Sequence, residues 1–370
     1  MCIALISTAH PSYPLILIDN RDEFLHRPTA ALDWWPSPKS HILGSRDMAR
    51  TAHGTWLGVT RSGKIAVLTN YREASTSAAA IIGQRSRGQM VNGFLEATQD
   101  TTAREYVEQL VSSGDAQLAG GFSLACGDVK GPLAIVSNRV EGKNGITWIA
   151  GRKGETVGLS NTVFGDRSWP KILDGERLMK EAIEASVKIG ESEDGLVDRL
   201  LGLLSTDTLP RLDEGGGLET YIDLLKESIF VPVIGDKEEE DLWKKRFQKH
   251  VHHHNRNNSH DSNGGGEEGK KIHHHHAGEE ICSSRVHDKV DVIPPPSPRE
   301  PPSHMYMSGV YGTQKQTVVL VHESGRLKYV ERTLFDDDAK AIPIGEGDRV
   351  FEFMVERQGG GDGEGGEKVG

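Results

Sequence analysis

Residues 1–24 read MCIALISTAHPSYPLILIDNRDEF, and this stretch decides the expected fold. Two apolar runs, residues 3–8 and 15–19, flank the segment HPSYP at residues 10–14, whose prolines favour a reversal of the chain. The two runs are therefore predicted to pair as an antiparallel hairpin. The polar tetrad Asn20-Arg21-Asp22-Glu23 follows the second run directly, so the hairpin would place it beside Cys2.

The rest of the chain alternates between groups of strands and blocks of helix. Helical spacing of apolar residues is found at residues 86–111 and 169–225. Short apolar runs predict further strands at residues 42–43, 55–60, 64–69, 122–126, 133–137, 147–150, 156–159, 317–322, 327–333 and 350–354. Because helices do not alternate singly with strands, a doubly wound parallel sheet is disfavoured. The predicted fold class is α+β, a four-layer αββα sandwich of two antiparallel sheets between helical layers.

Composition divides the chain into a core-forming part and two segments of low complexity. Residues 250–302 are rich in His, Gly and Pro, and residues 358–370 are mostly Gly and acid. Neither segment can bury enough apolar surface to offset the entropy of ordering its backbone, about 1–2 kcal/mol per residue. We therefore predict one domain over residues 1–357, a disordered insertion at 250–302 within it, and a flexible tail at 358–370.

Charge and cysteine usage exclude several classes of protein. The chain has 43 Lys+Arg against 54 Asp+Glu, a formal charge of −11, and this acidic balance argues against nucleic-acid binding. Apolar runs of about 20 residues, as a transmembrane helix needs, are not found. The first residues lack the basic start of a signal peptide, and the three cysteines form no disulfide framework. A cytoplasmic location is expected.

Cys2 is the first candidate for chemistry. If Met1 is removed, Cys2 carries a thiol and a free α-amine on one residue, and an amine with a pKa of about 7.7–8.0 can activate its own nucleophile. The alternative is that Cys2 is only a small residue near the start of the chain.

The polar tetrad and two asparagines are the next candidates. Side chains alternate along a strand, so Arg21 would share one face with Glu23, and Asn20 the other with Asp22. A guanidinium near Cys2 would favour its thiolate. Asn70 and Asn161 each follow a predicted strand, where an amide can donate to an oxyanion. A solvated ion cluster and ordinary turn residues are the alternatives.

Several motifs together resemble the NRDE family, also called the transport and Golgi organization 2 family. The opening MCIALISTAH, the tetrad NRDE, and the motifs GTWLG at 54–58, LTNYR at 68–72, GLSN at 158–161, WPK at 169–171 and YGT at 311–313 carry the resemblance in this order. It covers nearly all of the chain outside the low-complexity segments.

The resemblance implies a fold similar to N-terminal-nucleophile hydrolases and a set of site residues. By position, Cys2, Arg21, Asp22, Asn70 and Asn161 match the catalytic residues of the related acylases. Binding roles are implied for Asn20, Glu23, Trp56, Arg72 and Lys315, where Gln314-Lys315 replaces the arginine common in relatives.

Two functions follow from the resemblance. In the first, the protein acts in Golgi organisation and protein secretion, associates with the Golgi or mitochondria, and handles a hydrophobic metabolite, with haem as one such cargo rather than a resident cofactor. In the second, Cys2 is the nucleophile of an amidohydrolase acting on a small amide. A third interpretation makes the insertion a scaffold for partners.

The histidine-rich segment predicts weak, opportunistic metal binding rather than a specific metal site. His250, His252–His254, His260 and His273–His276 lie close together in the sequence but lack the spacing of a Cys₂His₂ site.

Overall fold

A computed structural model describes residues 1–73, 84–140, 145–212, 217–235 and 306–356, together with positions 238, 240, 241, 244 and 245. The predicted insertion at 250–302 and the tail at 358–370 lie outside the described residues, as does Cys282.

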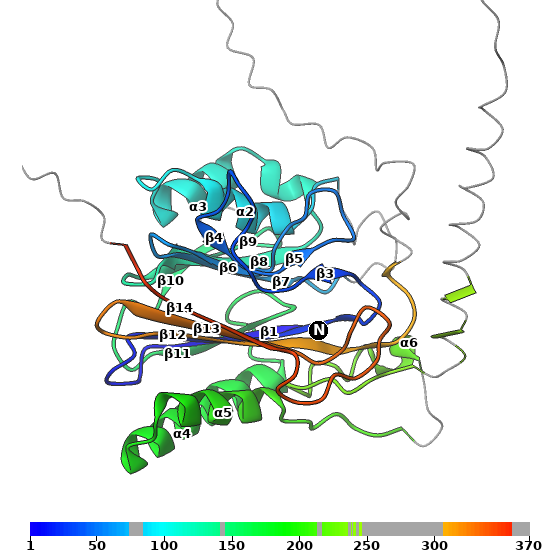
Figure 1. Cartoon of the computed structure of the whole chain (residues 1–370). Coiled ribbons are helices and arrows are strands. Elements are labelled where there is room, and N and C mark those ends of the chain that lie inside the picture. The colour runs from blue at the N-terminus through cyan, green and yellow to red at the C-terminus, as the bar shows by residue number, and fades with distance from the viewer. Residues whose placement is uncertain are drawn as a thin grey trace, which may run out of the picture.

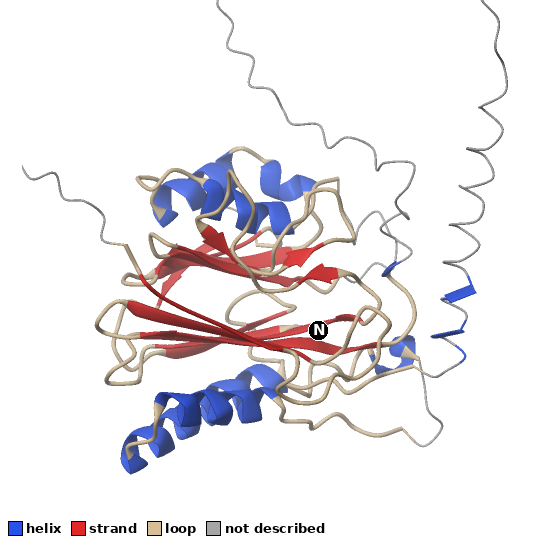
Figure 2. Ribbon diagram, viewed as in Figure 1, coloured by secondary structure: helices blue, strands red, loops and turns tan. Residues whose placement is uncertain are grey.

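Two six-stranded antiparallel sheets pack face to face between two helical layers (Figure 1). Helices α2 and α3 cover the outer face of one sheet, and α4 and α5 cover the outer face of the other (Figure 2). The predicted four-layer αββα sandwich is therefore confirmed, and its antiparallel pairing follows from the short turns between consecutive strands.

The first sheet contains the amino-terminal hairpin at its centre. Its strands, in spatial order, are β11 (Thr156–Ser160), β1 (Ile3–Ser7), β2 (Leu15–Phe24), β12 (Tyr311–Val321), β13 (Arg326–Thr333) and β14 (Asp348–Met354). β1 and β2 pair directly, with Ile3 opposite Asn20, as the hairpin prediction requires. The long-range neighbour β12 pairs with the other edge of β2, and its register shifts between Thr313 and Lys315.

The second sheet is a meander with a small ribbon beside it. Its spatial order is β10 (Ile146–Ile149), β9 (Leu133–Ser137), β8 (Phe122–Asp128), β7 (Lys64–Asn70), β6 (Leu57–Thr60) and β4 (Ile42–Leu43). The ribbon pairs β3 (Thr29–Ala30) with β5 (Arg46–Asp47).

Two of the described helices, α3 and α5, begin at a side-chain cap. The described helices are α2 (Gly88–Glu96), α3 (Ala103–Ser112), α4 (Pro170–Ile189), α5 (Glu193–Leu204) and the short α6 (Leu218–Tyr221). Thr102 and Glu105 form a capping box at the start of α3, and Pro170 begins α4. Gly190 ends α4 in the left-handed conformation.

Three apolar clusters hold the layers together. One fills the space between the sheets, one joins the first sheet to α4 and α5, and one joins the second sheet to α2 and α3. A fourth cluster contains Met1, Trp169, Ile172 and Leu225, and it anchors the start of the chain near α6.

The structure corrects the expected end of the second strand. β2 continues to Phe24, so the tetrad Asn20–Glu23 lies within the strand rather than after it. The extension is stabilised by β12, which pairs with β2 from Leu15 to Phe24 and therefore orders the polar residues as well as the apolar ones.

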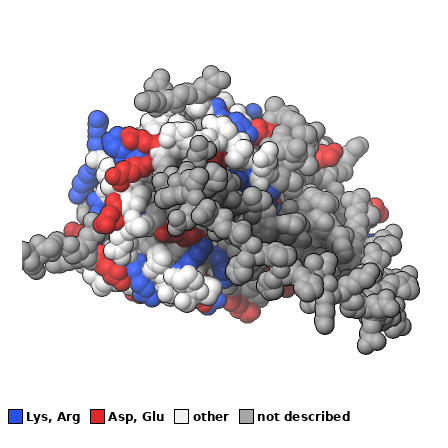
Figure 3. Space-filling view, turned by 90° about the horizontal axis from the view of Figure 1, so that it is seen from above, with Lys and Arg blue, Asp and Glu red and all other residues white. Residues whose placement is uncertain are grey.

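Among the described helices, none is long and apolar enough to cross a bilayer. On the visible part of the face in Figure 3, Lys and Arg side chains are interspersed with Asp and Glu.

Candidate functional site

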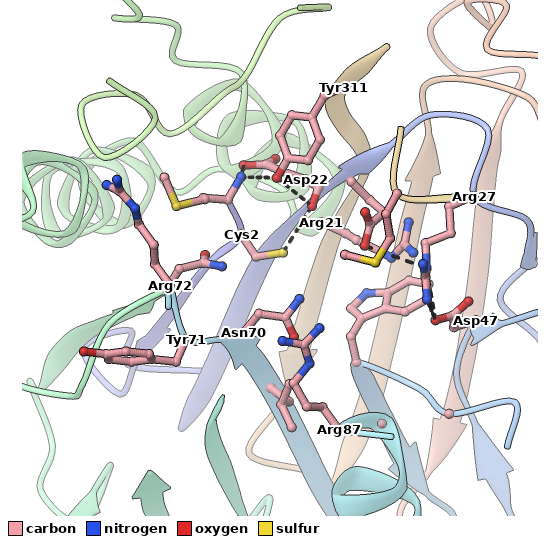
Figure 4. Close-up of a pocket in the computed structure, with 18 of the residues that line it drawn as sticks. Cys2, Arg21, Asp22, Arg27, Asp47, Asn70, Tyr71, Arg72, Arg87 and Tyr311 are labelled. Carbon is pink, nitrogen blue, oxygen red and sulfur yellow. Dashed lines mark hydrogen bonds and ion pairs between the residues drawn. The ribbon is translucent and has the colours of Figure 1, made fainter. Parts of the chain in front are cut away.

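A cavity of about 280 Å³ opens at one end of the sandwich, and Cys2 lies in it. β1 begins here, and β2, β7 and β11 end here, so the cavity collects side chains from both sheets. Figure 4 shows Cys2 at its centre, with Asn70 and Arg87 below and Asp22 and Tyr311 above. Five of the predicted site residues line this cavity: Cys2, Arg21, Asp22, Asn70 and Asn161.

The start of the chain is fixed by a buried polar cluster. The terminal amine of Met1 lies 3.0 Å from a carboxylate oxygen of Asp22 and donates to the Tyr311 hydroxyl at 2.5 Å. Tyr311 in turn donates to the Asp22 backbone carbonyl at 3.2 Å. Burial lowers the pKa of the Met1 amine, and the Asp22 carboxylate opposes that shift.

Two further residues complete this cluster. Thr313 donates to Asp22 Oδ1 at 2.7 Å, and the buried Lys171 ammonium donates to the Met1 carbonyl. Burial lowers the pKa of Lys171, while Asp22 and Cys2 raise it. Asp22 therefore organises three segments, the start of the chain, the start of β12 and, through Met1, the first turn of α4.

The Cys2 thiol faces the cavity and is partly buried. Burial raises its pKa to about 11, and the neighbouring amine offsets that shift only in part. The sulfur lies 3.7 Å from the Asp22 carbonyl oxygen, to which the thiol can donate. At neutral pH Cys2 is therefore a thiol in this structure, which corrects the expectation that a nearby arginine would favour the thiolate.

Arg21 is held by other partners than Cys2. Its guanidinium stacks 4.5 Å from the ring centroid of Trp56 and donates to the Gln314 side-chain oxygen. Both Arg21 and Trp56 line the cavity. Arg21 and Asp22 are adjacent on β2 and so lie on opposite faces of the strand, yet both line the cavity.

The two asparagines come from opposite sheets. Asn70 ends β7, and its side chain has no hydrogen-bond partner among the described residues. Asn161 follows β11; it is buried, and its Oδ1 has no partner in the described part of the chain. An amide without a protein partner beside a thiol is free to bind a ligand.

Three of the implied binding residues also line the cavity. Trp56 supplies a flat apolar wall, Glu23 lies 3.8 Å from Arg27, and Arg72 pairs with Asp223.

The other two implied binding residues lie outside the cavity. Asn20 faces the helical layer, where its amide donates to the carbonyls of Leu204 and Ile229 at 2.8 and 2.9 Å. Lys315 lies between the sheets and pairs with Glu331 at 2.8 Å. Asn20 shares its face of β2 with Asp22 but lies two residues farther from the cavity, opposite Ile3. Lys315 follows the register shift in β12 and pairs with Arg21 across the sheet.

Sequence reasoning missed several residues of the site, of which four matter most here. Tyr311 and Lys171 belong to the motifs YGT and WPK, but nothing in those motifs indicated contact with Met1. Arg50 and Arg87 also line the cavity. The segment RSRG at 85–88, at the start of the predicted helix, was the one signal that could have indicated Arg87.

Among the described residues, no cluster of His, Cys, Asp and Glu has the arrangement of a metal site. The predicted opportunistic metal-binding histidines lie outside the described residues.

Comparison with known proteins agrees with the family resemblance. The chain is 36% identical over 201 residues to a Transport and Golgi organization protein 2 homolog of Bos taurus, covering 53% of this chain and 67% of the relative. It is 32% identical over 220 residues to the Homo sapiens homolog, covering 56% of this chain and 72% of the relative. Among solved structures, it is similar to a Caenorhabditis elegans N-acylethanolamine-hydrolyzing acid amidase ortholog, with 13% identity, a TM-score of 0.39, and coverage of 61% of this chain and 98% of that one.

The match to a family model extends well beyond these pairwise alignments. The model described as Transport and Golgi organisation 2 matches residues 1–336, which include every motif quoted above and every residue that lines the cavity. The chain belongs to the Transport and Golgi organisation 2 family.

Proposed function

We propose that this protein binds a small hydrophobic metabolite in the cavity at Cys2 and acts through it in Golgi organisation and protein secretion. The observation that carries the proposal is the lining of the cavity. Leu218, Ile222, Leu225 and Met307 contribute apolar side chains to this lining, and polar residues surround Cys2. An amphipathic ligand with an apolar chain matches this division.

The cavity favours a lipid-like cargo over haem. Its volume of about 280 Å³ is near the lower end of small-molecule sites, which span about 300–1,000 Å³. Thiolate ligation of haem iron would also require Cys2 to lose its proton, and a pKa of about 11 opposes this. Family membership supports the cellular role, and we place that role at the Golgi or the mitochondria.

The test is a matched pair of substitutions of exposed isoleucines. Ile222 lines the cavity and is 39% exposed, whereas Ile189 at the end of α4 lies elsewhere and is 64% exposed. We expect I222D to weaken binding of a fluorescent fatty-acid probe at least tenfold and I189D to leave it unchanged. In cells depleted of this protein, I189D should restore secretion and I222D should not. Equal behaviour of the two variants in both assays would reject the proposal.

A second candidate function, an amidohydrolase, is favoured by the gathering of Asn70, Asn161 and Asp22 around Cys2. In this reaction Met1 is first removed, and the freed α-amine of Cys2 takes the thiol proton. The thiolate attacks the amide carbonyl while the Asn70 amide donates to the oxyanion. The leaving amine takes the proton, and water then hydrolyses the thioester to release the acid.

This candidate has its own test. Intact-mass analysis asks whether Met1 is removed, because in the described structure the nitrogen of Cys2 is part of a peptide bond. An amide-derived covalent adduct at Cys2 that turns over would support hydrolysis, and N70A should then slow turnover by about 10²–10³. A retained Met1 would exclude the reaction, while ligand binding by the intact chain would still support the first proposal.

A further inference from the structure

The cavity is lined by more positively than negatively charged side chains. Arg72 pairs with Asp223, Glu73 with Arg139, and the Asp22 carboxylate with the Met1 amine. After these pairs are set aside, two carboxylates, Glu23 and Asp47, face four guanidinium groups. The four are Arg21, Arg27, Arg50 and Arg87. The cavity floor therefore carries an excess of positive charge.

Two of the four arginines already have strong partners. Arg27 donates to Asp47 through Nε at 3.1 Å and through NH2 at 2.7 Å. Arg21 stacks on Trp56 and donates to Gln314. Arg27 therefore has a carboxylate partner within the protein, and the Arg21 guanidinium is held in place by its stacking on Trp56 and its hydrogen bond to Gln314.

The side chains of Arg50 and Arg87 lack a carboxylate within 4.0 Å in the described part of the chain. The Arg87 guanidinium makes one long hydrogen bond, 3.5 Å, to the Gly121 carbonyl. No hydrogen bond of the Arg50 side chain to a described residue is present. Each guanidinium carries five donors in a fixed fork, so most donors of both side chains have no partner in the described part of the chain.

The surroundings of Arg50 and Arg87 disfavour the charged forms of both side chains. Burial lowers the pKa of Arg87 to about 10; Glu23 opposes this shift, and Arg50 and Arg27 add to it. Burial also lowers the pKa of Arg50, again with a contribution from Arg27. Asp47 opposes the shift at Arg50. Both side chains are partly buried, and an anion between them would relieve the repulsion of their like charges.

The position of Arg87 links this charge to Cys2. Figure 4 shows its guanidinium pointing into the cavity below Asn70, on the side toward Cys2. Arg87 immediately precedes α2, and Gly88, the first residue of that helix, lines the same cavity. The apolar side chains of Leu218, Ile222 and Leu225 also line it.

We propose that Arg50 and Arg87 bind an anionic oxygen group of the ligand, a carboxylate or a phosphate, while its apolar chain lies against Leu218 and Ile222. The inference rests on the proposed binding function and names the class of ligand as an amphipathic anion. Guanidinium forks bind carboxylate and phosphate oxygens with charge-assisted, often bidentate hydrogen bonds, and a neutral ligand would leave both groups uncompensated.

Titration calorimetry with three probes that share one alkyl chain tests this inference. Octanoate and octyl phosphate carry the two anions, and octanamide is the neutral counterpart. We expect the full-length protein to bind at least one anionic probe about tenfold or more tightly than octanamide. The better of the two anionic probes identifies the anion.

The variants R50Q and R87Q should each weaken binding of the preferred anion about tenfold and leave octanamide unchanged. R87K keeps the charge but loses the fork, so its affinity for the preferred anion should lie between those of R87Q and the unmodified protein. If R87Q does not fold, R87K takes its place in the test. R177Q, on the exposed face of α4, is the matched control and should change nothing.

Equal affinity for the three probes, or equal losses for octanamide and the anions in R50Q and R87Q, would overturn the anion site while leaving the apolar cavity as a binding site. Failure of all three probes to bind would overturn both proposals.

Discussion

The backbone of Gly54 lies directly against the backbone of Gly88. A Cβ added to Gly54 would stand 2.7 Å from the Gly88 Cα, and one added to Gly88 would stand 2.8 Å from the Gly54 Cα. Such distances are shorter than van der Waals contact, so only glycine fits at either position. This contact sets where α2 begins, and therefore where Arg87 enters the cavity.

We expect G88A to reduce the free energy of unfolding by about 1–3 kcal/mol, because a rigid backbone has to move to admit the methyl group. Urea unfolding measures this change. G202A on α5 is the control, since a Cβ there meets nothing within 4 Å. A loss of stability in G202A equal to that in G88A would contradict the argument.

Removal of the side-chain amide is predicted to lower the stability of the protein at Asn20 but not at Asn70. N20A leaves the carbonyls of Leu204 and Ile229 buried without their donor, which should cost on the order of 2–4 kcal/mol. N70A removes no hydrogen bond to a described residue and should change stability by less than about 0.5 kcal/mol. Urea denaturation of both variants separates a structural asparagine from one that faces the cavity, and equal losses would refute this assignment.

The buried pair of Lys315 and Glu331 is predicted to matter for stability and not for ligand binding. Lys315 Nζ lies 2.8 Å from Glu331 Oε1, and Ser45 donates to the same carboxylate at 2.6 Å. K315M leaves a buried carboxylate without its cation and should cost about 3–5 kcal/mol. Adding E331L should recover much of this loss. An additive penalty in the double variant would show that the two charges are not coupled.

Alkylation of Cys2 is predicted to depend steeply on pH. Because burial raises the thiol pKa to about 11, the thiolate is scarce at pH 8 and increases about tenfold for each pH unit up to pH 10. Peptide mapping after timed treatment with iodoacetamide measures the rate at Cys2 separately from that at Cys126, which is fully buried. A rate at Cys2 that levels off near pH 8 would indicate an ordinary or lowered thiol pKa.

Glu193 is predicted to stabilise the fold at neutral pH and to lose this effect in acid. Burial would raise its pKa, but hydrogen bonds from Arg326, Tyr13 and Lys328 outweigh it and lower the pKa to about 2. The unfolded chain binds its proton near pH 4.3, so the stabilisation is present above that pH and is lost as pH falls toward 2. The side chain is partly exposed, so we expect E193Q to cost on the order of 1 kcal/mol at pH 7.

Urea unfolding at pH 7, 4 and 3 follows the difference between E193Q and the unmodified protein. The difference should shrink below pH 4, and the exposed pair variant E181Q should show little difference at any pH. A stability difference between the two proteins that grows as the pH falls would show that the Glu193 carboxylate does not stabilise the fold in the way proposed.

The sequence by itself determined the hairpin of β1 and β2, the block order of strands and helices, and the placement of Asn20 and Arg21 on opposite faces of one strand. These features depend on short turns and on residue periodicity, which act over a few neighbouring positions. The family motifs added Asn70 and Asn161 to the same site, and both line the cavity.

Only the tertiary structure decided which of these residues reach the cavity and in what charge state. The register shift in β12 turned Lys315 toward Glu331, and the contact between Gly54 and Gly88 brought Arg87 beside Cys2. The high pKa of Cys2 arises from the loss of solvent around its thiol in the folded chain. Long-range pairing, close backbone contact and burial depend on segments far apart in the chain, and residue periodicity carries no information about them.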